Sequence, residues 1–121
     1  GHARLKTKAD PTGKLVLGTL NNCAGGFTPW GTVLTAEENF DTCFGGKITD
    51  AKIAKREQLN YARLGIKGET DYAWSRHVER FDLAKEPLEP NRFGWIVEYD
   101  PYDPKSKPVK RTALGRCKHE G

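Results

Sequence analysis

Two pairs of acidic residues lie close together in this sequence, and such pairs suit a hard cation. Glu37 and Glu38 are adjacent and follow a short β-branched run. Adjacent side chains on a strand point to opposite faces, so only one of them faces a site directly unless the strand end turns both inward. Carboxylate oxygens are the ligands that Ca²⁺ prefers. From spacing alone, a solvated strand end is the simpler interpretation of this pair.

The second pair is Glu98 and Asp100, which are two positions apart and therefore share one face of a strand. Two carboxylates on one face repel each other unless a cation or a proton lies between them. In the alternative interpretation Asp100 caps the turn that begins at Pro101, and Glu98 faces solvent. The spacing leaves both interpretations open.

Cys23 is a candidate ligand of a different kind, because it lies in the glycine-rich run Asn-Asn-Cys-Ala-Gly-Gly. A thiolate is a soft ligand that selects iron, zinc or copper over calcium. A small buried side chain is one alternative. A cysteine nucleophile, with His77 or His119 as its base, is another. The three cysteines form no Cys-x-x-Cys pair, so a tetrahedral zinc site is not indicated.

The composition points to a piece of something larger. Only 36% of the 121 residues are apolar, and 13 glycines and 7 prolines make the chain rich in loops. The formal charge of +4 is spread among acidic residues, so we expect no nucleic-acid partner. No run approaches the roughly 20 apolar residues of a membrane span, so we expect no membrane association. No export signal is visible in these residues.

The pattern predicts four strands separated by turns and a helical stretch. One helix is predicted between a cap at Thr49 or Asp50 and a stop at Gly65, because the residues between them are good helix formers. A second, shorter helix is predicted at residues 71–80. Residues 21–31 are expected to be a loop, and the three tryptophans to lie in the core. The predicted strands cover residues 14–20, 32–37, 93–99 and 109–114.

These elements predict a β-rich fold with a helical insertion, which would be α+β as an isolated piece, with antiparallel strands. We expect one fragment over residues 1–121, in three parts. The parts are a strand, glycine loop and strand at 15–40, a helical insertion at 41–90 and a β-hairpin at 91–121. Exposed strand edges would allow self-association.

The order of the candidate residues resembles the signature of the PhoX-type alkaline phosphatases, from about Leu15 onward. The resemblance rests on Asn22-Cys23-Ala24-Gly25-Gly26-x-Thr28-Pro29-Trp30-Gly31-Thr32 followed by Leu34-Thr35-x-Glu37-Glu38, on Arg92-Phe93-Gly94-Trp95-x-Val97-Glu98-x-Asp100-Pro101, and on Lys110-Arg111-Thr112-Ala113-Leu114-Gly115-Arg116 with His119-Glu120-Gly121.

The resemblance implies a secreted or periplasmic hydrolase of phosphate monoesters, built on a β-propeller with iron and calcium ions. By resemblance, Cys23 would contact iron, and the carboxylates would be ligands, with Glu98 and Asp100 on calcium. His119 matches the motif without an assigned role, and no catalytic residue is identified. The implied metal ligands are Cys23, Glu37, Glu38, Glu98, Asp100 and Glu120.

A propeller needs several four-stranded blades, far more than 121 residues provide. We therefore expect the remainder of a parent chain to complete the metal site, and the 121 residues alone to be inactive. The alternative is a non-catalytic calcium-binding or interaction module that carries the family's motif. Calcium without iron in the parent protein would indicate that module.

Overall fold

The computed structural model describes residues 1–120. The chain divides into two compact units. One unit is mostly helical and contains residues 1–15 and 40–92; the other carries the sheet and contains residues 16–39 and those from 93 onward. The sheet unit holds every residue that the sequence analysis selected as a metal ligand.

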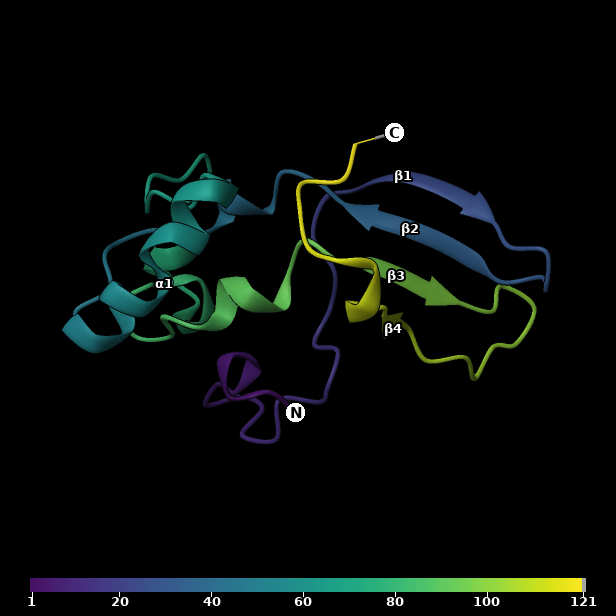
Figure 1. Cartoon of the computed structure of the whole chain (residues 1–121), viewed down its shortest axis with the longest axis horizontal. Coiled ribbons are helices and arrows are strands. Elements are labelled where there is room, and N and C mark those ends of the chain that lie inside the picture. The colour runs from purple at the N-terminus through teal and green to yellow at the C-terminus, as the bar shows by residue number, and fades with distance from the viewer. Residues whose placement is uncertain (121) are drawn as a thin grey trace. The chain divides into compact units, whose positions relative to one another are not determined.

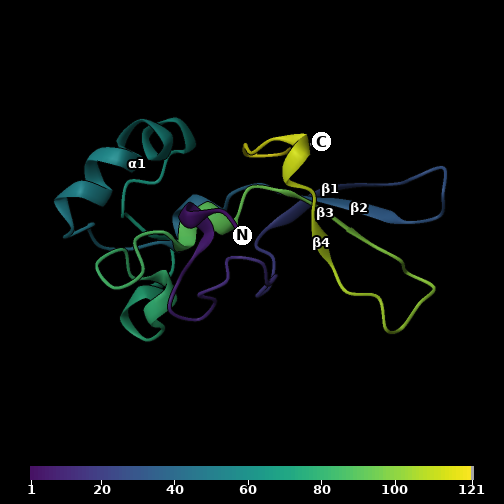
Figure 2. The same cartoon turned by 60° about the horizontal axis from the view of Figure 1, so that its bottom comes forward.

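The sheet unit has four antiparallel strands in the order β1-β2-β3-β4 (Figures 1 and 2). Their bounds are β1 Asn22–Phe27, β2 Val33–Glu37, β3 Ile96–Tyr99 and β4 Val109–Lys110. Consecutive strands are neighbours, so each pairing is a hairpin or a return after the helical stretch. The predicted antiparallel sheet with a helical insertion is therefore confirmed in this form.

The first strand lies where a loop was expected, and the strand predicted at residues 14–20 is wrong. The backbone N–H of Leu15 donates to the Asp10 carboxylate and that of Leu20 to the Glu37 carboxylate, so neither joins a ladder. Gly18 has a φ of 111°, which lies outside the strand region. The glycine-rich run pairs with β2 instead, and its register shifts between Asn22 and Gly25.

The last two strands are shorter than predicted. β3 starts at Ile96 rather than Phe93, because Gly94 has a φ of 87° and the N–H groups of Gly94 and Trp95 donate to Glu37. β4 ends at Lys110, and residues 112–114 form a 3₁₀ turn. Beyond it, Arg116 donates to the Phe93 carbonyl and holds the C-terminal segment beside the start of β3.

The predicted helix is confirmed as α1, Ala51–Leu64 (Figure 1). The Asp50 carboxylate accepts the N–H groups of Lys52 and Ile53, which satisfies donors that the first turn leaves unpaired. Gly65 ends the helix in the left-handed region at a φ of 74°, a conformation that glycine adopts without steric cost.

A helix over residues 71–80 is the second wrong prediction. That stretch forms two 3₁₀ helices, Ala73–Arg76 and Glu79–Phe81. Val78, between them, has an extended backbone with a φ of −126°, which no α-helix accommodates. Aromatic contacts take the place of a helix face, since the Trp74 ring lies 4.7 Å from Tyr72 and 5.2 Å from Phe81.

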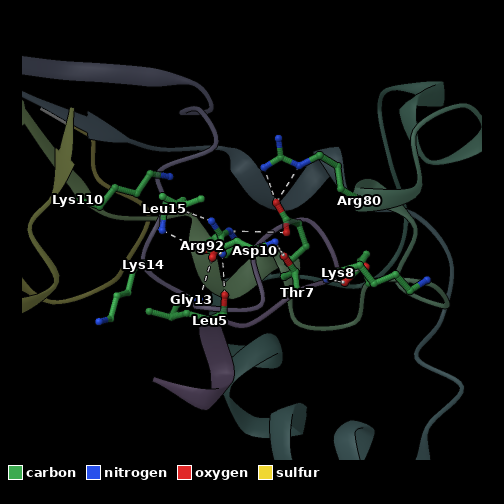
Figure 3. A network of polar contacts seen from close by, with 12 residues as sticks. Leu5, Thr7, Lys8, Asp10, Gly13, Lys14, Leu15, Arg80, Arg92 and Lys110 are labelled. Atoms are coloured by element: carbon green, nitrogen blue, oxygen red, sulfur yellow. Dashed lines mark hydrogen bonds and ion pairs between the residues drawn. The ribbon is translucent and has the colours of Figure 1, made fainter. Parts of the chain in front are cut away.

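Arg92 ties the N-terminal residues to the helical unit (Figure 3). Its guanidinium donates to the Leu5 carbonyl at 2.7 Å, to the Asp10 carboxylate at 3.0 Å and to the Leu15 carbonyl. Burial acts to raise the pKa of Asp10, but the Thr12 hydroxyl, the Leu15 N–H and Arg92 together hold that pKa below its ordinary value. Arg92 thus binds residues 5–15 at three points along the segment.

The expectation that the tryptophans lie in the core is wrong for two of them. Trp30 is 70% exposed and Trp74 is 39% exposed, whereas Trp95 is partly buried. The largest buried apolar side chains are phenylalanines: Phe40 and Phe44 in the helical unit, and Phe93 in the sheet unit. Among residues 1–120, no helix has the length and apolar character needed to cross a membrane.

A candidate metal centre in the sheet unit

Glu37 is fully buried and is surrounded by donors. One carboxylate oxygen accepts the Leu20 N–H at 2.9 Å and the Lys110 ammonium at 2.9 Å. The other accepts the N–H groups of Gly94 at 3.0 Å and Trp95 at 3.1 Å. A carboxylate offers about four lone-pair positions. Four donors therefore occupy Glu37, which joins the segment before β1 to β2, β3 and β4.

Glu98 is also buried, and three donors bind its carboxylate. The Thr32 hydroxyl donates to one carboxylate oxygen at 2.5 Å and the Trp30 indole N–H to the same oxygen at 2.9 Å. The Arg111 guanidinium donates to the other at 2.6 Å. These three donors, Thr32 first, lower the pKa of Glu98 to about 2. Glu98 does not face solvent; it links the β1–β2 turn to the segment after β4.

Asp100 is exposed and caps the turn that follows β3. Its carboxylate accepts the Tyr102 N–H at 2.9 Å, and its own N–H donates to the Ser106 hydroxyl at 2.8 Å. This is the turn-capping alternative that the spacing had left open. One carboxylate oxygen is used in this way, which leaves the group partly available to a cation.

Cys23 and Glu38 lie at one end of the sheet. Asn22 pairs with Glu37, and the Glu38 N–H donates to the Asn21 carbonyl at 3.0 Å, so the start of β1 lies beside the end of β2. Glu38 follows the last residue of β2, and strand alternation directs its side chain away from that of Glu37. Cys23 is exposed and falls where the β1 register shifts. Bulges of this kind often redirect side chains beside functional sites.

Glu38 is the carboxylate that the sheet leaves available. It is partly buried, yet its carboxylate takes part in no hydrogen bond or ion pair with the described residues 1–120. The contrast with Glu37 follows from strand alternation: one acid points to the donor-lined face and its neighbour points away from it. Of the adjacent pair, Glu38 is the one with lone pairs to offer a cation.

The C-terminal segment returns to the same end of the sheet. The His119 N–H donates to the Glu37 carbonyl at 3.0 Å, and the His119 ring lies 3.3 Å from the Cys117 sulfur. Glu120 follows and is exposed. Gly121, which closes the motif, lies outside the described residues. Glu120 is therefore carried by a segment that is anchored next to Glu38.

The candidate ligands do not form one coordination shell. Glu98 pairs with Leu34, four residues before Glu38 along β2. At about 3.3 Å per residue, some 13 Å of strand separates the two positions. Within residues 1–120, no group of three or more His, Cys, Asp and Glu side chains is arranged to hold a metal ion. The chain thus offers two separate sets of donors, neither of them a complete metal site.

The donors fit the implied ions in part. Cys23, Glu38 and Glu120 at one end, and Asp100 near the other, have atoms that can bind a cation. Protein donors occupy the four lone-pair positions of Glu37 and three of those of Glu98. The sequence analysis missed those donors: Lys110, Arg111, Trp30 and Thr32. The alternation of side chains along a strand indicates which residues share a face. It does not give the register of β4 against β3, which brings Lys110 and Arg111 to these carboxylates.

Comparison with known proteins identifies the class. The chain matches the family described as alkaline phosphatase PhoX over residues 1–121. A solved structure, Pseudomonas fluorescens PhoX in complex with vanadate, a transition state analogue, is 51% identical and superposes with a TM-score of 0.79. The match covers 98% of this chain and 20% of that one. A search of curated proteins found no match.

This chain belongs to the PhoX alkaline phosphatase family. It spans 20% of the length of the solved relative, so it corresponds to one portion of a longer family member. The sequence resemblance is confirmed at the level of the family. The ligand assignments are not tested by these comparisons.

Proposed function

We propose that this chain is part of a secreted or periplasmic, metal-dependent phosphomonoester hydrolase, and that it supplies ligands to an iron and calcium site within a β-propeller. The observation that carries the proposal is the match to the PhoX alkaline phosphatases over residues 1–121. The exposed thiol of Cys23 and the available carboxylate of Glu38, which both belong to residues at one end of the sheet, support it.

In this proposal each candidate residue has a distinct task. Cys23 supplies a soft thiolate to iron, and Glu38 and Glu120 supply hard oxygen ligands from the same end of the sheet. Asp100 supplies a further carboxylate, on calcium. When bound, such cations neutralise phosphate oxygens and stabilise the charge that develops during displacement.

Glu37 and Glu98 have a positioning task in this proposal, which differs from the ligand role that the family resemblance implied for them. The bonds of Glu37 to Leu20, Gly94, Trp95 and Lys110 fix the backbone from which Glu38 projects. Glu98, bonded to Arg111, fixes the strand that leads to Asp100. Ligands held on a rigid backbone bind without a large cost of ordering.

The remainder of the parent chain would complete the site and bind the phosphate monoester. An incomplete ligand set leaves carboxylates without a compensating cation and lowers the affinity for metal. We therefore expect the 121 residues alone to show no turnover of p-nitrophenyl phosphate. Robust turnover by these residues alone would contradict this part of the proposal.

The full-length parent tests the ligand assignment through Cys23→Ser. Elemental analysis should find iron lost and calcium retained, with hydrolysis of p-nitrophenyl phosphate lost as well. Cys117→Ser is the matched control, because Cys117 is also an exposed thiol of the sheet unit, and it should keep iron and activity. Iron retained at full occupancy in Cys23→Ser would refute the assignment. Calcium without iron or hydrolysis in the unsubstituted parent would instead indicate a binding module.

A further inference from the structure

We propose that an apolar row at the turn end of the sheet, formed by Phe27, Val33 and Tyr99, is the docking surface for an apolar segment of the parent chain that lies outside these 121 residues. Phe27 pairs with Val33, and Val33 pairs with Tyr99, so the three lie in line across β1, β2 and β3. Figure 1 shows β1 ending, β2 beginning and β3 ending on the same side of the sheet.

The row is exposed although the face to which it belongs is not a solvent face. Phe27 is 74% exposed and Tyr99 is 37% exposed. Two residues further along the same face, Val97 is 1% exposed, and Glu37 beyond it is fully buried. The row therefore continues a face of the sheet that is buried at Val97 and Glu37. Phe27 and Tyr99 form the exposed end of that face.

The charges on this face indicate what kind of segment can bind to the row. Among the described strand residues on it, the charged side chains are Glu37 and Lys110, which bind each other at 2.9 Å. The positions around the row are Gly25, Thr35 and Val97, which carry no charge. A charged segment would therefore find no oppositely charged side chain on this face. An apolar segment could cover the row without burying an unpaired charge.

The small area of the row favours a segment of the same parent chain as its binding partner, rather than a second copy of the protein. Phe27 and Tyr99 together expose roughly 200 Å², if a buried aromatic side chain covers 150–250 Å². A stable complex between separate chains buries about 800 Å² on each partner. A segment on the same chain needs far less area, because its effective concentration is high. The match covers only 20% of the solved relative, so a longer family member has ample chain to supply it.

Thiol labelling of the full-length parent tests the docking surface. Phe27→Cys in the folded monomeric parent should react with a maleimide at least tenfold more slowly than the same variant unfolded in urea, with labelled peptides resolved by mass spectrometry. Leu59→Cys, 85% exposed on α1, is labelled in the same way as a position outside the row. Hydroxyl-radical footprinting of the unsubstituted parent, folded and unfolded, measures the same protection at Phe27, so the test does not depend on how the variants fold.

Two results would overturn the inference. The first is a labelling rate at Phe27 in the folded monomeric parent that equals the rate in the unfolded parent. The second is protection of Phe27 that appears only as the protein concentration rises, because a second copy would then be the occupant. The inference rests on family membership and not on hydrolysis, so its failure would leave the proposed phosphatase activity standing.

Discussion

Replacing Glu37 with glutamine is the sharpest test of the sheet unit, because this side chain is either a structural link or a metal ligand. The substitution keeps the shape but removes the charge that neutralises the Lys110 ammonium, whose side chain is 10% exposed. It also turns an amide NH₂ group towards donors that need an acceptor. The structure therefore predicts a large loss of stability.

The magnitude follows from the burial of the pair. Breaking a buried ion pair by removing one partner costs about 3–5 kcal/mol. In a domain of this size each kcal/mol lowers Tm by roughly 4 °C. The expected fall in Tm is therefore about 12–20 °C, or failure of the sheet unit to fold. Adding Lys110→Met should recover part of this loss, because it removes the uncompensated charge.

Thermal unfolding, followed by circular dichroism and tryptophan fluorescence, measures the effect. Glu79→Gln is the matched control, since the Glu79–Lys85 pair is formed at 3.1 Å between exposed side chains and should leave Tm unchanged within error. A Tm shift in Glu37→Gln no larger than in Glu79→Gln would refute the structural role. Unchanged stability with loss of metal from the full-length parent would instead make Glu37 a ligand.

Two further predictions concern two other ion pairs, each of which has a buried carboxylate. The donors from Thr32, Trp30 and Arg111 hold the pKa of Glu98 at about 2, below its ordinary 4.5, so its contribution to stability is present above pH 4.5 and is lost as pH falls towards 2. Glu98→Gln should flatten the fall in urea midpoint over that window, and an unchanged slope would contradict the assignment. Arg92→Met should release residues 5–15, which would appear as faster tryptic cleavage after Lys14 and faster amide exchange at Leu15; protection equal to that of the unsubstituted chain would show that other contacts order the segment.

The elements that were predicted correctly are those whose signals are local. The α1 helix has its cap at Asp50, its helix-forming interior and its stop at Gly65 within one stretch of sequence. The β2 strand has its β-branched run, and the β3–β4 hairpin has its Asp-Pro turn. The failures at residues 14–20 and 71–80 share a cause. The apolar run at 14–20 and the helical spacing of Trp74, Val78 and Phe81 were interpreted from local sequence alone. The Glu37 carboxylate, which binds Leu20, and the aromatic contacts of Trp74 set the backbone there instead.

The sequence by itself determined the family, the identities of the candidate ligands and the hairpin order, because these depend on residue types and their order along the chain. Only the tertiary structure decided which acids are available. Glu37 and Glu38 are neighbours in sequence, yet Lys110 and the N–H groups of Leu20, Gly94 and Trp95 converge on Glu37. These four donors come from three places along the chain, and the strand register brings them to the Glu37 carboxylate but not to that of Glu38.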